Sequence, residues 1–509
     1  MTWVDWLVLV AAVAAIVVAD ARWLRVAQRE HYVPGEATTF AGLWLVKRPV
    51  NAGLAIAVVV LTLVGFVLPL VSIAAAIVLV FWPVGLGIRG SKASLVLTAR
   101  AKRMLAAVAV LQLISLAVTF LVFAPLTMVV AALTPVLVDL GLAIMSPVEA
   151  SLASRFVRQA EQNLAKVNPT VVGITGSYGK TSTKLYVDFV LSGSQTVLAS
   201  PGSFNNLMGL SRTINDQLRP GTSVLIAEMG TYGPGEIRKL CTSFPPTVAV
   251  ITSIGEAHLS RMKDRATIVR AKSEITEKAP AIVLNIDEPE LAELADRLET
   301  DRRVVRCSTH GAAEADVAVA AVDGQWRIVL GGDELVSIPA QQFGHPINLA
   351  CAIGVARALD VTPTASMFAR RTLPGAPHRA ELVQGPQGIS VIDDTYNSNP
   401  TGAAHAVRGA AERLAGDGRL YVVTPGMVEL GSKQAQRNAD LARLAVSRPN
   451  HTLVIVGWTN RRALLSGAAD GPGKVLCFES RDEATEAVSA RLKEHDVVLY
   501  ENDLPDHYA

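Results

Sequence analysis

Two long stretches of the chain, residues 49–88 and 104–138, contain no charged side chain. A helix that crosses the hydrocarbon layer of a membrane needs about 20 apolar residues, so each stretch is long enough to cross twice. Each stretch also has a proline near its middle, Pro69 and Pro125, and a proline ends a helix or begins a turn. We therefore predict that each stretch forms a helical hairpin in a membrane.

A third apolar segment precedes these hairpins, at residues 3–19. Its start carries Asp5 rather than a basic residue, which favours a retained helix over a cleaved signal peptide. Buried helices of a large soluble protein are the alternative interpretation. The sequence predicts five spans, at residues 3–21, 50–68, 70–88, 104–124 and 126–146.

Basic residues are concentrated in two of the connections between these spans, residues 22–48 and 89–103. The positive-inside rule places both connections in the cytoplasm. Five spans then put the N-terminus outside and everything after residue 150 in the cytoplasm of a multi-pass protein of the cell membrane. Asp139 is the one ionisable residue well inside a predicted span, and it is either functional or a hydrogen-bond partner within the bundle.

The rest of the chain has the composition of a soluble protein. Residues 1–150 contain 10 basic and 6 acidic residues, and residues 151–509 contain 37 and 39. The net charge of +2 argues against a nucleic-acid-binding protein, which needs a strongly basic surface. The four cysteines are scattered singly, which excludes a zinc ribbon and a disulfide framework.

Short β-branched runs alternate with helical segments after residue 150, a pattern typical of parallel sheets with helices on both faces. One series of runs lies at residues 170–175, 223–228, 247–252 and 281–286. A second series follows the proline-rich segment 373–378, at residues 389–394, 419–425, 451–457 and 497–502. We therefore predict a transmembrane helical domain (1–150), a parallel-sheet α/β domain (151–373) and a smaller Rossmann-like α/β domain (374–509).

A glycine-rich loop follows the first predicted strand and opens a helix. Its sequence is Gly173-Ile-Thr-Gly176-Ser-Tyr-Gly179-Lys180-Thr181-Ser182. The backbone N–H groups of such a loop surround phosphates, the lysine places a charge on the terminal phosphates, and the threonine hydroxyl can bind Mg²⁺. The larger α/β domain is therefore predicted to be a P-loop-type ATPase domain, in which ATP is bound by Gly176, Ser177, Gly179, Lys180, Thr181 and Ser182.

This loop is one residue longer than the common phosphate loop, and it resembles that of the Mur ligases and the related folylpolyglutamate synthases. Further segments match the family in its order along the chain: residues 203–209, 227–230, 235–237, 254–259, 271–275 and 285–287. In the last domain, residues 392–400 and 426–431 are closest to the D-alanyl-D-alanine-adding branch of the family. The resemblance extends over residues 155–509.

The resemblance implies ATP-dependent amide synthesis, in which a carboxylate is phosphorylated and an amine then displaces the phosphate. Two Mg²⁺ ions would offset the repulsion between the γ-phosphate and the carboxylate. Glu228 ends an apolar strand and His258 follows the next one, so both suit metal binding, whereas Lys272 becomes an anionic ligand if it is carbamylated as in the family. The expected catalytic residues are Lys180, Glu228, His258 and Lys272, and the expected metal ligands are Thr181, Glu228, His258 and Lys272.

Five more positions are expected to contact the nucleotide. Asn285 matches a residue that helps seat adenine, and Asn348 stands in Gly344-His345-Pro346-Ile347-Asn348, an altered form of a family motif. Arg379 matches the arginine that opens the last domain. Asp394 and Tyr396 are expected to reach ATP when that domain closes, because an acyl phosphate must be kept from water. Simple turns are the alternative interpretation at Asn285 and Asp394.

The chain departs from the family at its front, where soluble members carry a domain that grips a UDP-sugar. The predicted bundle stands there instead, so we expect a carboxylate substrate held at the lipid bilayer, such as a lipid-linked cell-wall peptide precursor, with an amino acid or dipeptide as the amine. The alternatives are an ammonia-using amidotransferase subunit, a poly-γ-glutamate-type synthase, an ATP-driven transporter and a non-catalytic ATP-binding membrane scaffold. The absence of a cysteine cluster argues against the first, and the retained Lys180 and Glu228 argue against the last.

Overall fold

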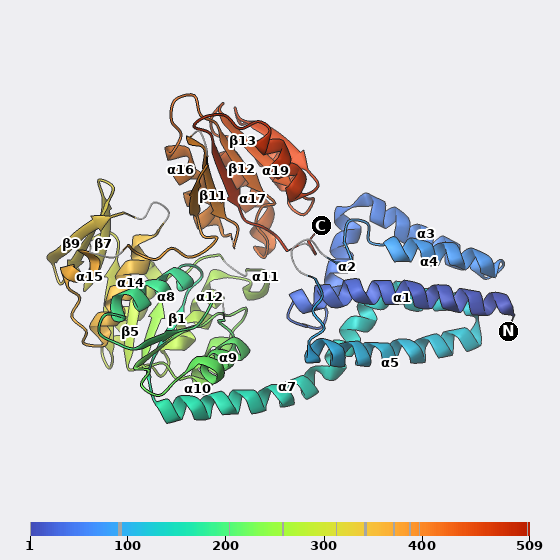
Figure 1. Ribbon diagram of the computed structural model, residues 1–509, viewed down its shortest axis with the longest axis horizontal. Coiled ribbons are helices and arrows are strands. Elements are labelled where there is room, and N and C mark those ends of the chain that lie inside the picture. Colours follow the sequence, from blue (N-terminus) through green and yellow to red (C-terminus); the bar gives the residue numbers. More distant parts are fainter. Residues whose placement is uncertain are drawn as a thin grey trace. The chain divides into compact units, whose positions relative to one another are not determined.

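The computed structural model (Figure 1) describes residues 2–89, 94–202, 204–256, 259–311, 313–340, 344–369, 372–385, 388–396, 398–505 and 507–508. The chain forms two compact units. The first contains Met1–Leu152 together with two short segments from late in the chain, Gly457–Thr459 and Leu504–Ala509. The second contains Ala153–Val456 and Asn460–Asp503.

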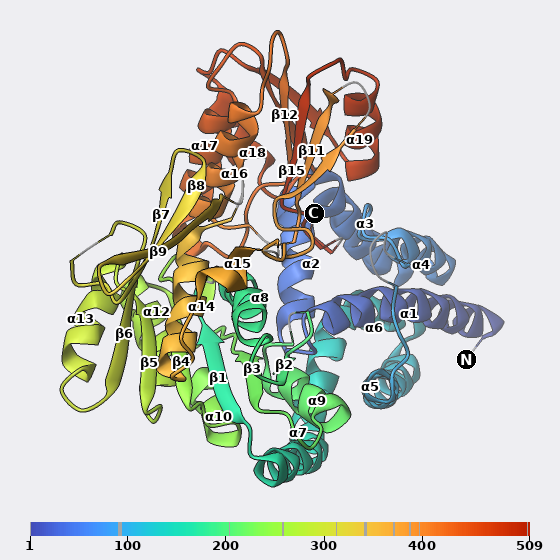
Figure 2. The ribbon, with the colours of Figure 1, turned by 60° about the vertical axis from the view of Figure 1, so that its left-hand side comes forward.

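The first unit is helical. Its helices are α1 (Trp3–Arg29), α2 (Glu36–Lys47), α3 (Pro49–Gly65), α4 (Ser72–Phe81), α5 (Ala99–Val122), α6 (Thr127–Ala132) and α7 (Thr134–Val167), the last of which continues into the second unit. In both views α1, α3, α4 and α5 run alongside one another (Figures 1 and 2). Small side chains such as Ala12 and Ala75 fill the interior, whereas Val10, Val17 and Leu121 are exposed. A helical unit that is apolar on its outer surface suits a lipid environment.

Three of these helices are long and apolar enough to cross a membrane, judged by length and composition: α1, α5 and α7. A fourth candidate is the pair α2 and α3, which is bent by 109°. Pro69 and Pro125 each lie in a single 3₁₀ turn that joins two helices, so the predicted break at each proline is confirmed, whereas the placement of these hairpins in a membrane stays a prediction. The predicted number of five spans is not confirmed within the described residues.

The predicted span at 70–88 is helical only as far as Phe81. The carbonyl groups beyond the helix accept hydrogen bonds from α1: Arg22 Nε donates to Leu86 O at 2.9 Å, and Arg25 Nη2 donates to Gly87 O at 2.8 Å. Carbonyl groups outside a helix or sheet need such partners where water does not reach them. Residues 82–88 therefore form a loop whose carbonyl groups accept hydrogen bonds from arginines of α1. The lack of charged side chains in this segment does not indicate a continued helix.

Asp139 on α7 has a structural partner. Its carboxylate accepts hydrogen bonds from the N–H groups of Ala37 and Thr38 at 3.2 and 2.8 Å, and from the Thr38 hydroxyl at 2.6 Å. These groups lie in the first turn of α2, whose own N-cap is Gly35 and has no side-chain cap. Asp139 thus caps α2 from another helix, which is the structural alternative that the sequence left open.

The last residues of the chain also belong to this unit. His507 is buried, its Nε2 lies 2.8 Å from a Glu30 carboxylate oxygen, and its carbonyl oxygen accepts a hydrogen bond from Trp44 Nε1 at 2.9 Å. Phe40 contacts the rings of both His507 and Tyr508 edge to face. This aromatic cluster attaches the end of the chain to α2.

The second unit contains a nine-stranded sheet in the order β2-β3-β1-β4-β5-β6-β7-β8-β9. The strands through β7 are parallel and β7 to β9 are antiparallel. The strands are β1 (Thr170–Thr175), β2 (Val197–Ala199), β3 (Val224–Glu228), β4 (Val248–Ile251), β5 (Ala281–Asn285), β6 (Arg303–Ser308), β7 (Val317–Val322), β8 (Gln325–Leu330) and β9 (Asp333–Pro339).

Helices cover both faces of this sheet (Figure 2) because the central strands are apolar on both sides. Val172 and Val250 face α8 (Lys180–Leu191) and α14 (Pro346–Ala358). Leu225 and Ile251 face the opposite layer. That layer contains α9 (Leu207–Gln217), α10 (Glu236–Ser243), α12 (Arg265–Ser273) and α13 (Pro289–Leu298). The domain also has two short helices, α11 (Leu259–Met262) and α15 (Ala365–Ala369).

A second, six-stranded sheet has the order β10-β11-β15-β12-β13-β14 and is parallel except for β10. Its strands are β10 (Glu381–Gln384), β11 (Ser390–Asp394), β12 (Leu420–Thr424), β13 (His451–Val456), β14 (Lys474–Phe478) and β15 (Val497–Glu501). Its helices are α16 (Pro400–Glu412), α17 (Gln434–Ala445), α18 (Arg461–Ala468) and α19 (Arg481–Ser489). All eight predicted strands are confirmed, and the predicted boundary at residue 373 lies between the two sheets and stays a prediction.

Candidate active site

The glycine-rich loop lies where it was predicted, between β1 and α8. Gly179 is the N-cap of α8 and has a φ of 83°, in the left-handed region that favours glycine. A Cβ at this position would also come within 2.2 Å of Asn348 Oδ1. The loop therefore needs glycine here both for its turn and for the close approach of α14.

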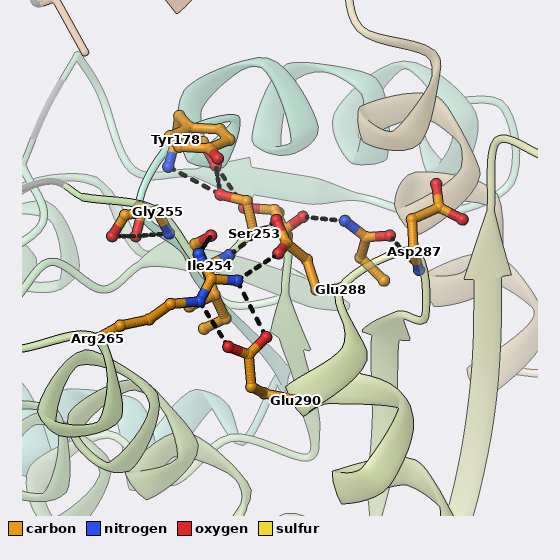
Figure 3. A network of polar contacts seen from close by, with 11 residues as sticks. Tyr178, Ser253, Ile254, Gly255, Arg265, Asp287, Glu288 and Glu290 are labelled. Atoms are coloured by element: carbon orange, nitrogen blue, oxygen red, sulfur yellow. Dashed lines mark hydrogen bonds and ion pairs between the residues drawn. The ribbon is translucent and has the colours of Figure 1, made fainter. Parts of the chain in front are cut away.

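Contacts with the loop after β4 hold the glycine-rich loop in shape (Figure 3). Tyr178 N donates to Ser253 Oγ at 2.9 Å, and Thr252 Oγ1 donates to Tyr178 O at 2.6 Å. The hydroxyl of Ser177 accepts from Gly255 N at 2.8 Å. Because these contacts join residues 177–178 to residues 252–255, the two loops form one rigid piece.

Three predicted residues meet at the start of α8. Lys180 Nζ donates to Gly176 O at 2.8 Å, and Thr181 Oγ1 donates to Glu228 Oε2 at 3.0 Å. Burial lowers the pKa of Lys180, partly against the opposing effect of the Glu228 charge. The structure thus places a lysine, a hydroxyl and a carboxylate at the N-terminus of a helix, an arrangement suited to a phosphate and its cation.

A second lysine in this cluster was missed by the sequence analysis. Lys184 is 2% exposed, and its Nζ lies 3.2 Å from Glu228 Oε2 and donates to Gly202 O at 2.6 Å. Asn205 Nδ2 donates to the other carboxylate oxygen at 3.2 Å. Burial opposes ionisation of Glu228, but the charges of Lys180 and Lys184 outweigh it and hold the pKa of Glu228 below its ordinary value.

Lys272 lies near the end of α12 and is 3% exposed. Burial, with a further contribution from the positive charge of Lys180, lowers its pKa well below the ordinary value. A lowered pKa favours the uncharged amine of a lysine, which is the form that reacts as a nucleophile. His258 lies outside the described residues, so its place relative to this cluster is not given.

A cavity of about 840 Å³ lies beside the glycine-rich loop. Its lining includes six residues predicted to bind the nucleotide: Gly179, Ser182, Asn285, Asn348, Arg379 and Asp394. Asn285 joins two neighbouring loops, since its Nδ2 donates to Thr252 O at 3.0 Å and its Oδ1 accepts from Asp287 N at 3.0 Å. A cavity of this size can hold a nucleotide.

Residues at the start of the last domain reach the same cluster. Arg379 Nη2 donates to Thr181 Oγ1 at 3.4 Å, and its guanidinium lies 4.6 Å from the centre of the Tyr396 ring. Asp394 Oδ1 accepts a hydrogen bond from Ala380 N at 3.1 Å, and burial raises the pKa of Asp394 to about 6. Arg379 therefore brings a permanent positive charge toward the position of the terminal phosphates.

Comparison with known proteins shows which family has sequences similar to this chain. The Mur ligase middle domain matches residues 174–356, and the Mur ligase glutamate ligase domain matches residues 378–500. The UDP-N-acetylmuramoyl-tripeptide–D-alanyl-D-alanine ligase of Mycobacterium tuberculosis (strain ATCC 25618 / H37Rv) is 32% identical over 371 residues, which cover 65% of this chain and 69% of that protein. The chain belongs to the Mur ligase family. This Mur ligase is therefore an ATP-dependent enzyme that forms an amide bond.

Other relatives agree with this assignment. The enzyme of the same name from Bacillus subtilis is 30% identical over 274 residues, which cover 53% of this chain and 59% of that protein. Among solved structures, MurF from Acinetobacter baumannii has a TM-score of 0.58 at 25% identity and covers 68% of this chain and 76% of its own. MurF from Thermotoga maritima in complex with ADP has the same fold, with a TM-score of 0.58 at 24% identity, and covers 69% of this chain and 80% of its own.

The cofactors of this Mur ligase are ATP and Mg²⁺. Mg²⁺ typically takes one or two protein ligands and fills its octahedral shell with phosphate oxygens and water. Thr181 Oγ1 and Glu228 Oε2, 3.0 Å apart, fit that requirement. Among the described residues no group of three or more His, Cys, Asp or Glu side chains could hold a metal ion.

Proposed function

We propose that this Mur ligase joins an amine to the carboxylate of a peptidoglycan peptide precursor. The observation that carries the proposal is the cluster of Lys180, Thr181, Lys184 and Glu228 at the start of α8, with Arg379 entering from the last domain. Several relatives are UDP-N-acetylmuramoyl-tripeptide–D-alanyl-D-alanine ligases, which supports a dipeptide as the amine.

The reaction requires two displacements. A carboxylate oxygen of the precursor attacks the γ-phosphorus of ATP, and ADP leaves with the electron pair of the broken P–O bond. The amine nitrogen then attacks the acyl carbon, and inorganic phosphate leaves as the amide forms and a proton is released. The first step brings two anions together, the carboxylate and the γ-phosphate, and the second requires that water be kept from the acyl phosphate, so positioned cations and exclusion of water supply most of the catalysis.

Each residue of the cluster has a task in this scheme. Lys180 and Arg379 offset the charge of the transferred phosphoryl group, and Thr181 and Glu228 would hold a Mg²⁺ ion, which would polarise that group. Lys184 keeps Glu228 ionised in its buried position. His258 and Lys272 are proposed to hold a second ion, with Lys272 carbamylated. The lowered pKa of Lys272 supports this role, because the uncharged amine is the form that captures CO₂.

The proposed location is the cell membrane, with the second unit in the cytoplasm. The three long apolar helices, their apolar outer surface and the basic residues between them support this. Two epitope tags test it: protease added to intact cells should remove a tag placed before Thr2 and leave untouched a tag inserted at the exposed turn at Asp323–Gly324. Cleavage of the second tag would overturn the proposed orientation.

The proposed acceptor is a lipid-linked form of the precursor, since a membrane anchor keeps the enzyme at the bilayer where such a substrate lies. The test uses the full chain in nanodiscs with ATP, Mg²⁺ and D-alanyl-D-alanine. Lipid-linked and UDP-linked muramoyl tripeptide are supplied separately, and ADP release and the peptide product are both measured. Turnover of the UDP-linked form alone would refute lipid linkage while leaving the ligase activity intact.

A further inference from the structure

Glu256 links the two sheets of the second unit. It follows β4 in the loop that packs against the glycine-rich loop, yet its partners lie in the last domain. Lys433 Nζ lies 2.8 Å from Glu256 Oε1, and Arg437 donates from Nε at 2.7 Å and from Nη2 at 2.8 Å. The Arg437 contact is two-pronged, which is the strongest geometry for an arginine–carboxylate pair.

The two cations come from one short stretch. Lys433 ends the 3₁₀ turn Gly431–Lys433, and Arg437 lies in the first turn of α17. The Glu256 side chain is 18% exposed, against 32% for Arg437 and 49% for Lys433. The carboxylate of Glu256 is thus partly shielded from water, whereas its two cationic partners are more exposed. The ion pairs can therefore form and break without leaving a charge that is fully buried and unpaired.

The loop that carries Glu256 is fixed on its other side (Figure 3). Arg265 donates from Nη1 to Ile254 O at 3.0 Å and from Nη2 to Glu288 at 2.8 Å, and its Nε pairs with Glu290 at 2.5 Å. The N–H of Gly255 donates to Ser177 Oγ in the glycine-rich loop at 2.8 Å. Glu256 is therefore joined to the glycine-rich loop through its neighbour Gly255.

A second contact between the domains lies close to the reacting phosphate, where Arg379 reaches Thr181. Arg379 alone is a weak attachment, since its hydrogen bond is 3.4 Å long. The Glu256 contacts are shorter and charged on both sides. They are therefore better placed to hold the last domain against the middle domain while Arg379 acts on the nucleotide.

We propose that Glu256 is the docking point of the last domain, and that its ion pairs with Lys433 and Arg437 form the latch that keeps Arg379 at the phosphate site during turnover. The proposal rests on the proposed ligase function for its catalytic consequence. Glu256 and Arg437 are positioning residues, since neither contacts the phosphate-binding side chains. If the latch operates, the contact needs opposite charges at positions 256 and 437. Exchanging the two charges between these positions should therefore preserve it.

The experiment uses the full chain in nanodiscs with ADP and Mg²⁺ and measures the domain contact directly. Cys477 is exposed on the last domain and the other three cysteines are buried, so a spin label at Cys477 and one at Glu293→Cys on α13 report the distance between the domains. Glu256→Arg and Arg437→Glu should each broaden the distance distribution, and the double variant should restore the narrow one. Arg443→Gln, on the same helix but paired with Asp440, is the matched control.

Turnover gives the second readout. Glu256→Gln should lower kcat about tenfold while the Kd for ATP stays within about twofold, because the glycine-rich loop is intact. The charge-reversed pair should recover most of the loss. Unchanged distances in both single variants, or a double variant as broad as the singles, would overturn the latch. Normal distances in an enzyme without ligase activity would instead count against the proposed function alone.

Discussion

Replacement of Lys184 by methionine tests how the site keeps Glu228 ionised. The two side chains are 3% and 2% exposed, and Lys184 is the cation in direct contact with the carboxylate. Removing one partner of a buried ion pair costs about 3–5 kcal/mol, because the other charge is left without compensation. Methionine keeps most of the volume of lysine, so packing contributes little to this loss. Lys184→Met should therefore lower the local stability of the domain by this amount.

Hydrogen exchange at β3 measures the effect, since Glu228 ends that strand and all five of its residues are buried. Where these amides exchange through unfolding, the loss corresponds to exchange faster by about 100-fold to about 4,000-fold. Lys239→Met, at an exposed position on α10, is the control and should change little. Glu228→Gln added to Lys184→Met should restore much of the protection, because the carboxylate that lost its direct partner is then uncharged.

Two results would contradict this reasoning. Exchange within about threefold of the wild type in Lys184→Met would mean that Lys180, Asn205 and Thr181 together compensate the carboxylate, against the magnitude expected for a buried pair. Fast exchange that Glu228→Gln does not reverse would mean that the lost contact with Gly202 O, and not the orphaned charge, destabilises the domain.

Three further outcomes follow from other parts of the molecule. Lys180→Ala should abolish ATP-dependent ADP release while the thermal unfolding of the full chain stays near that of the wild type, whereas persistent turnover would remove Lys180 from the reaction. Asp139→Ala should destabilise the first unit by about 0.5–2 kcal/mol, measured by thermal unfolding in detergent, and Asp139→Asn should cost less because it keeps a hydrogen-bond acceptor. His451 is buried, and burial with the Arg448 charge lowers its pKa below 6.5. The contribution of His451 to the free energy of unfolding is therefore fully present above pH 6.5 and is lost as the pH drops below that value. A His451→Gln variant that kept this pH dependence would show that His451 does not cause it.

The sequence was a good guide to the parallel strands, because buried strands in such sheets are uninterrupted apolar runs. It missed the antiparallel extension β7–β9, whose strands are half exposed and interrupted by polar residues. The signal was nevertheless present in the turns. Asp323-Gly324 and Gly331-Gly332 are two-residue connections in which both residues have positive φ, the turn type that Asp-Gly and Gly-Gly favour in hairpins.

Part of the candidate site followed from the order of motifs, and part did not. Thr181 and Glu228 were predicted to share a cation, and the structure brings them within hydrogen-bonding distance. Lys184 was overlooked, although it lies three residues after Thr181 and therefore on the same face of α8. The partners of Glu256 had no sequence signal, because Lys433 and Arg437 are brought to it only by the contact between two domains.

The residues around Glu228 carry more positive than negative charge, and this surplus links several features of the site. Lys180, Lys184 and Arg379 face a single carboxylate, and the charge of Arg379 itself lowers the pKa of both lysines. A cluster with surplus positive charge is costly to assemble in a protein interior and is matched by a polyanion such as a triphosphate. Lys272 lies in the same positive surroundings, and burial, with the charge of Lys180, disfavours its ammonium form. The electrostatics of the folded chain therefore favour the uncharged amine of Lys272, which is the form from which the proposed carbamylation would start.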